Sequence, residues 1–101
     1  MRTLLKFTLD VQAANHAISN GSLPKILGNI MELVKPEAAY FTTVEDTRTV
    51  FVFFDMPDSS WIPRIAEPLF QDLNAKVNFY PVMNQQELEQ GLGAYMQTQK
   101  G

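Results

Sequence analysis

The segment Thr49–Met56, which reads TVFVFFDM, is apolar on both of the faces that a β-strand would present. Successive side chains of a strand point to opposite sides of a sheet. The segment therefore carries apolar side chains on both sides, with Val50, Val52 and Phe54 on one and Phe51 and Phe53 on the other. A chain of 101 residues supplies helices for one side of a small sheet, so the sequence raises the question of what covers the second.

The composition fits one domain that spans residues 1–101, because 46% of the residues are hydrophobic and the chain is long enough for a single core. Cysteine is absent, which excludes disulfides and thiolate metal sites and favours a reducing compartment. No apolar stretch approaches the roughly 20 residues that span a bilayer, and no signal-like start is present. We therefore expect a soluble, cytoplasmic protein without a membrane partner.

The charge balance argues against a nucleic-acid partner. Eight basic and eleven acidic residues give a formal charge of -3, and the lysines and arginines are scattered along the chain. Proteins that bind nucleic acids normally carry a basic surface that displaces counterions from the phosphates. We also expect no metal site, because no cluster of metal-ligating residues occurs in the sequence.

Hydrophobic periodicity and turn residues predict the order strand, helix, strand, strand, helix, strand, helix. The expected elements are a strand at 3–9, a helix in two pieces from Val11 to Val34 broken at Asn20–Gly21, strands at 38–44 and 49–56 joined by the polar residues 45–48, a helix over 61–73, a strand at 75–83 and a short helix from Asn84.

Two prolines give further expectations. Pro68 lies inside the predicted helix over 61–73, where a proline loses a hydrogen bond and costs about 3 kcal/mol or more. We therefore expect a kink or a restart near Glu67. Pro81 has no N–H to donate to a sheet, so its strand is expected at a sheet edge.

Capping residues mark three predicted helix starts. Asp10 and Ser22 are expected to cap the two pieces of the first helix. The sequence Asn84-Gln85-Gln86-Glu87 resembles a capping box and opens the short C-terminal helix. One side of that helix is apolar and carries Leu88, Leu92, Tyr95 and Met96.

The element order predicts an α+β fold of the ferredoxin-like βαββαβ type with a C-terminal helix. Both main helices lie on one side of a four-stranded antiparallel sheet, because βαβ crossovers are right-handed in about 98% of cases. The bare side measures on the order of 400 Å², while the largest apolar patch of an ordinary monomer is about 300 to 600 Å². We expect a second copy to cover it in an isologous homodimer. The alternative is a monomer whose C-terminal helix covers this side.

The element order and the strand that is apolar on both faces resemble the dimeric α+β barrel superfamily. The stretches PEAAYFT, IAEPLF and LNAKVNFYPVM are also similar to small bacterial members of that superfamily. It includes small monooxygenases, haem-degrading enzymes, muconolactone-isomerase-like proteins and stress-responsive proteins of unassigned chemistry. The resemblance covers nearly the whole chain at the level of the fold, and it implies that paired sheets enclose a shared interior.

The haem-degrading members of this superfamily use an Asn, a Trp and a His drawn from a strand and two helices. Trp61 and His16 are present here, but His16 stands on the first predicted helix and the first predicted strand has no Asn. The sequence departs from that pattern, and we expect no cofactor.

Polar residues on the otherwise apolar strands are the candidate ligand-binding residues, because a few polar groups in an apolar cavity orient a small ligand. A lysine in such a cavity would hold an anion or act as a base. The candidate set is Lys6, Thr8, Tyr40, Thr42, Phe51, Phe53, Asn78 and Tyr80. Alternation leaves open whether the polar members face an interior or reach water at the strand ends.

The sequence supports two functional hypotheses. The first is a homodimer that binds a small apolar or aromatic molecule between paired sheets, and a solidly packed dimer without a cavity is its structural variant. The second is a cofactor-poor monooxygenase or isomerase, for which Lys6, His16 and Tyr80 are the candidate catalytic residues. His16 is the only histidine, and a surface or packing role is the favoured interpretation of it. Asp55 is either a carboxylate at the mouth of the interior or a turn residue.

Overall fold

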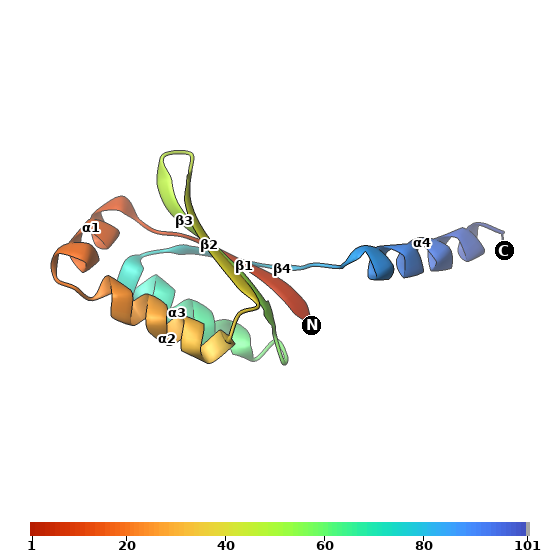
Figure 1. The fold of residues 1–101 in the computed structure, drawn as a ribbon, viewed down its shortest axis with the longest axis horizontal. Coiled ribbons are helices and arrows are strands. Elements are labelled where there is room, and N and C mark those ends of the chain that lie inside the picture. The colour runs from red at the N-terminus through yellow and green to blue at the C-terminus, as the bar shows by residue number, and fades with distance from the viewer. Residues whose placement is uncertain (101) are drawn as a thin grey trace.

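The computed structural model, which describes residues 1–100, contains one antiparallel sheet with the strand order β2-β3-β1-β4 (Figure 1). The strands are β1 (Arg2–Thr8), β2 (Ala38–Val44), β3 (Thr47–Asp55) and β4 (Lys76–Pro81), and the helices are α1 (Val11–Ser19), α2 (Leu23–Val34), α3 (Trp61–Leu73) and α4 (Gln85–Lys100). This order confirms the expected fold class, an α+β fold of the ferredoxin-like type with a C-terminal helix.

The core lies between the sheet and the helices α2 and α3, which pack side by side on one of its faces (Figure 1). Alternation along the strands decides which residues reach it. Leu5 and Phe7 of β1 are fully buried, as are Val52 and Phe54 of β3, whereas their sequence neighbours on the other face keep part of their surface exposed. The helices add residues at three- and four-residue spacing, including Ile30, Val34, Ile65, Leu69 and Leu73.

The two-piece helix before β2 follows its capping and turn residues. The carboxylate of Asp10 accepts a hydrogen bond from the Ala13 N–H at 2.9 Å, which confirms the expected cap of α1. Gly21 adopts a φ of 77°, a backbone conformation that suits glycine, and so separates α1 from α2. Ser22 stands at the start of α2 but its side chain makes no capping bond, so this part of the prediction is wrong. Its N–H instead donates to the Asn20 side chain.

The β2–β3 hairpin is tighter than the sequence predicted. Glu45 and Asp46 both have positive φ angles, 50° and 67°, as a two-residue type I′ turn requires. The turn pairs Val44 directly with Thr47, so β3 begins two residues before the expected Thr49. The right-handed twist of the strands favours this turn over the four-residue loop that we expected at 45–48.

The predictions for Pro68 and Pro81 have different outcomes. α3 runs without interruption from Trp61 to Leu73 with Pro68 inside it, so the helix does not restart near Glu67. Pro68 is exposed, which leaves the unpaired carbonyl of the preceding turn on the side of the helix that water reaches. Pro81 ends β4, and β4 is an edge strand as expected.

The C-terminal helix α4 projects away from the sheet (Figure 1). Asn84 and Glu87 form the expected capping box, in which each backbone N–H donates to the other residue's side chain at 2.9 and 2.8 Å. With 16 residues α4 is longer than the short helix we expected, and residues 83–99 are all exposed. The alternative in which this helix covers the second face of the sheet is therefore wrong for this structure.

Two phenylalanines allow the position of the core to be tested. Phe7 is fully buried on β1, whereas Phe41 on the edge strand β2 is 60% exposed. We expect Phe7→Ala to lower the free energy of unfolding by about 3 to 5 kcal/mol, because it leaves a cavity in a packed core. Phe41→Ala should lower it by less than about 1 kcal/mol, since a surface change of this kind leaves no cavity. Urea unfolding at one fixed protein concentration measures both, and equal losses would contradict the assignment.

Candidate functional site

The candidate site is the face of the sheet that α1, α2 and α3 leave uncovered, called the open face below (Figure 1). The strand registers arrange the side chains at its centre in three cross-strand rows, and the pairs Arg2–Asp55 and Val44–Thr47 continue the same face beyond them at the two ends. The apolar row is Ala38, Phe53, Leu4 and Tyr80; the middle row is Tyr40, Phe51, Lys6 and Asn78; the threonine row is Thr42, Thr49, Thr8 and Lys76. Only Thr49 is buried within these rows, and the other members are partly or largely exposed.

The type of side chain on the open face changes from row to row along the strands. Neighbouring rows lie two residues apart along a strand, which is about 7 Å. The apolar row is at the end of the sheet where β4 leads into α4, and the threonine row is at the other end. The face therefore changes from large apolar side chains through a mixed row to small hydroxyl side chains over about 14 Å.

All of the candidate ligand-binding residues from the sequence lie on the open face. These are Lys6, Thr8, Tyr40, Thr42, Phe51, Phe53, Asn78 and Tyr80. Four further members of the rows were missed as site residues: Leu4, Ala38, Thr49 and Lys76. Their positions follow from the same alternation along the strands. The two criteria that selected the candidates, a polar residue on an apolar strand and a place in the phenylalanine run, did not select them.

Lys6 occupies the centre of the open face. It is directly opposite Phe51 of β3 and Asn78 of β4. Tyr80 is its diagonal neighbour, at the separation of about 7 to 8 Å that such pairs have. Within residues 1–99 Lys6 has no ion-pair partner, although its side chain is partly buried. The sheet thus presents a cation among aromatic and amide groups.

His16 does not join the other two candidate catalytic residues. It is exposed on α1, in an open depression of about 390 Å³ that also includes Lys25 and Asp72. α1 belongs to the helix layer, whereas Lys6 and Tyr80 are on the opposite face of the sheet. A reaction centre that uses all three side chains is therefore not assembled in this chain.

Trp61 is also separate from His16. It starts α3 beside Pro57 and Leu33, whereas the depression at His16 is next to Asp72 near the other end of the same helix. The Arg64 guanidinium stacks over the Trp61 ring, 4.1 Å from its centroid. The Trp and His that the superfamily's haem chemistry would need are thus at opposite ends of α3.

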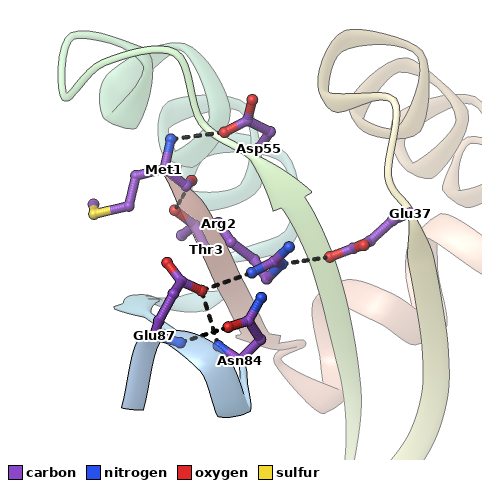
Figure 2. Close-up of polar contacts among 7 residues, drawn as sticks. All are labelled: Met1, Arg2, Thr3, Glu37, Asp55, Asn84 and Glu87. Carbon is purple, nitrogen blue, oxygen red and sulfur yellow. Dashed lines mark hydrogen bonds and ion pairs between the residues drawn. The ribbon is translucent and has the colours of Figure 1, made fainter. Parts of the chain in front are cut away.

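A charged cluster closes the end of the sheet next to the apolar row (Figure 2). The Arg2 guanidinium contacts Glu37 at 3.3 Å and Glu87 at 3.0 Å, and the amino group of Met1 contacts Asp55 at 2.7 Å. These groups are all substantially exposed, so water screens each ion pair and its contribution to stability is small. The cluster was missed from sequence, because Arg2 meets residues from two distant segments that no local pattern connects.

Asp55 and Asp58 are the two carboxyl groups whose environment changes their acidity. The hydrogen bond and charge of the Met1 amino group lower the pKa of Asp55. Asp55 is therefore ion-paired with the Met1 amino group at the end of the sheet, outside the three rows of the open face. The Ser60 hydroxyl and the Ser60 backbone N–H, the latter at 2.8 Å, donate to Asp58 and lower its pKa.

Two further classes of site were searched for in the part of the chain that the structure describes. No group of three or more histidine, aspartate or glutamate side chains there is placed to hold a metal ion. No helix within residues 1–100 has both the length and the apolar character needed to cross a membrane.

The sequence matches none of the protein-family models, and a search of curated proteins finds no significant relative. The functional conclusion therefore depends on the fold and on the chemistry of the open face.

Asp58 gives a pH-dependent prediction. Because its pKa is lower in the folded chain than in the unfolded chain, its stabilising effect is present above the ordinary aspartate pKa of about 4 and is lost as the pH falls through the lower folded value. In Asp58→Asn an amide oxygen still accepts the Ser60 bonds but does not titrate. We expect the variant's thermal midpoint to fall less than that of the original protein as the pH drops below about 4. Identical pH profiles would contradict this role of Asp58.

Proposed function

We propose that this protein is a homodimer of the dimeric α+β barrel type, in which two open faces stack and enclose an interior that binds a small apolar or aromatic molecule. The observation that carries the proposal is the open face itself. It presents Leu4, Phe51, Phe53, Tyr40 and Tyr80 without cover from the chain's own helices.

Interface area supports a second copy as the cover. The open face contributes about 400 Å² in projection, whereas a stable complex buries about 600 to 1,000 Å² on each partner. The exposed helix α4 supplies the difference, since 16 residues make a cylinder about 24 Å long and about 10 Å wide. Its contact strip adds roughly 240 Å² in projection, which brings each partner to about 640 Å².

The exposed apolar side chains of α4 also favour contact with a partner. Its apolar side chains Leu88, Leu92, Tyr95 and Met96 are 42% to 57% exposed. Helices of this length are marginally stable in water when nothing packs against them, and Gly91 and Gly93 each lower the helix propensity by about 1 kcal/mol. Packing of the apolar stripe on a second copy would stabilise the helix and cover the stripe at the same time.

The rows of the open face favour one orientation of the pair. A two-fold axis parallel to the strands places each apolar row against the apolar row of the partner, with Lys6 of one protomer across from Phe51 of the other. An axis across the strands would instead oppose the apolar row to the threonine row and bring the two Lys6 side chains face to face. Apolar burial and charge repulsion both favour the first arrangement.

This arrangement also explains where an enclosed space would form. Stacked sheets are about 10 Å apart, a distance that large side chains fill by interdigitation. The apolar row supplies such side chains, whereas Thr8, Thr42 and Thr49 in the threonine row are short. The interior would therefore be closed at the apolar end and roomier toward the threonines, which supports a ligand cavity over a solidly packed interface.

The dimer is tested by light scattering at micromolar concentration, where we expect a particle of twice 11.4 kDa. Phe53→Asp should convert it to a monomer, because the change places an unpaired carboxylate among the apolar side chains of the buried interface. Phe70→Asp is the matched control, since Phe70 is 42% exposed on α3 in the helix layer, and it should remain dimeric. Circular dichroism confirms that both variants are folded. A particle of 11.4 kDa for the unmodified protein at every concentration would reject the proposal.

The contribution of α4 is tested separately. Leu92→Asp alters the apolar stripe, whereas Gln90→Asp introduces the same carboxylate on another side of the helix. We expect Leu92→Asp to raise the dimer dissociation constant roughly tenfold or more, because it removes a buried leucine from the interface, and Gln90→Asp to change it little. Sedimentation over a dilution series measures both. Equal constants for the two variants would show that the stripe does not contact the partner.

A further inference from the structure

We infer that the ligand of the open face is an anion, an aromatic or apolar molecule that carries one acidic group such as a carboxylate, and that Lys6 binds this group. The inference rests on the proposed dimer and names the chemical class of the molecule between its sheets. It follows from the charges of the open face, from its symmetry and from the spacing of its rows.

The open face is positively charged although the protein as a whole is acidic. Its three rows contain Lys6 and Lys76 and no aspartate or glutamate. The whole chain has a formal charge of -3, so the acidic residues are concentrated elsewhere. A face of this sign attracts small anions, and low-dielectric walls around it strengthen the attraction.

Symmetry prevents the partner from neutralising Lys6. In an isologous pair both protomers present the same residues, so three rows without carboxylates meet three rows without carboxylates, while Asp55, beyond the apolar row, is already paired with the Met1 amino group. Lys6 has no ion-pair partner within residues 1–99 of its own chain. Stacking the sheets would therefore remove water from a lysine that nothing on either face pairs with, and a buried charge is tolerated only when it is paired. A bound anion provides the missing partner.

The spacing of the rows defines the shape of the ligand. Thr8 and Thr49 in the threonine row, where the interior is roomier, are about 7 Å from Lys6 along the sheet, the length of roughly one aromatic ring with its substituent. The amide of Asn78, directly opposite Lys6, is a second donor for the acidic group. The geometry fits an acidic group at Lys6 in the middle row and an apolar body that lies along Phe51 and extends toward the threonine row. The two-fold axis gives two such sites in each dimer.

Arg2 does not offer a competing anion site. Its guanidinium already contacts the carboxylates of Glu37 and Glu87 in the charged cluster (Figure 2). The open depression of about 470 Å³ beside it is lined by Glu37, Asp55 and Glu87 together with Arg2 and Lys35, so its carboxylates outnumber its cations and disfavour an anion. Lys6 is thus a cation of the open face that is partly buried and has no ion-pair partner within residues 1–99.

Two fluorescent probes of nearly the same shape test this inference. Anilinonaphthalenesulfonate is an aromatic anion, and N-phenylnaphthylamine is its counterpart without the sulfonate. We expect the intact dimer to bind both saturably and to prefer the anion. Lys6→Met should weaken binding of the sulfonate roughly tenfold or more, the scale of one hydrogen bond to a charged group. Binding of the neutral probe should change by less than a factor of about three.

Two further variants complete the design. Lys6→Arg should retain binding of the sulfonate, because it keeps the charge. Lys25→Met removes a lysine from α2 in the helix layer and should leave both probes unaffected. The dimer is verified by light scattering for each variant before titration.

The outcomes separate the inference from the proposed function. If Lys6→Met affects both probes equally, or affects neither, the anion assignment is overturned while the enclosed apolar interior remains supported. If neither probe binds the intact dimer, the interior does not take molecules of this class, and both the ligand-binding proposal and the anion assignment are overturned.

Discussion

The rest of the structure depends on one constraint, that a sheet with two apolar faces receives helices on only one of them. Right-handed crossovers place α2 and α3 on the same side of the sheet, where they bury Val52 and Phe54 of β3. The same strand holds Phe51 and Phe53 on the opposite side by simple alternation. No rearrangement of this strand covers both pairs with one layer of helices, so the second pair needs a further element to cover it or remains exposed to water.

The position of the C-terminal helix α4 adds a second apolar surface that the chain leaves uncovered. A helix that folded back over the open face would cover its own apolar stripe and the sheet together. α4 instead leaves the edge strand β4 and is connected to the body by the exposed ion pair between Arg2 and Glu87. A contact of that strength does not fix the direction of a 16-residue helix, which leaves α4 able to follow a binding partner. The protein therefore has two uncovered apolar surfaces, and the second copy that we propose would cover both.

The local elements were predictable because each has a local cause. Asp10 and the pair Asn84 and Glu87 make the expected capping bonds, and Pro81 ends an edge strand. The errors also have local causes: two residues with positive φ shorten the β2–β3 turn, and Pro68 is accommodated on the wet side of α3. The direction of α4 and the charged cluster around Arg2 were not predictable, since both depend on how distant segments meet.

The sequence by itself determined the element order, the alternation along each strand and the presence of two apolar faces on β3, because these depend on neighbours in the chain. Only the tertiary structure decided which face of each strand the helices cover. That choice placed Lys6 at the centre of the open face, set His16 apart from it and left α4 without cover. The physical reason is that covering a face requires contacts between segments far apart in sequence, whose packing no local pattern specifies.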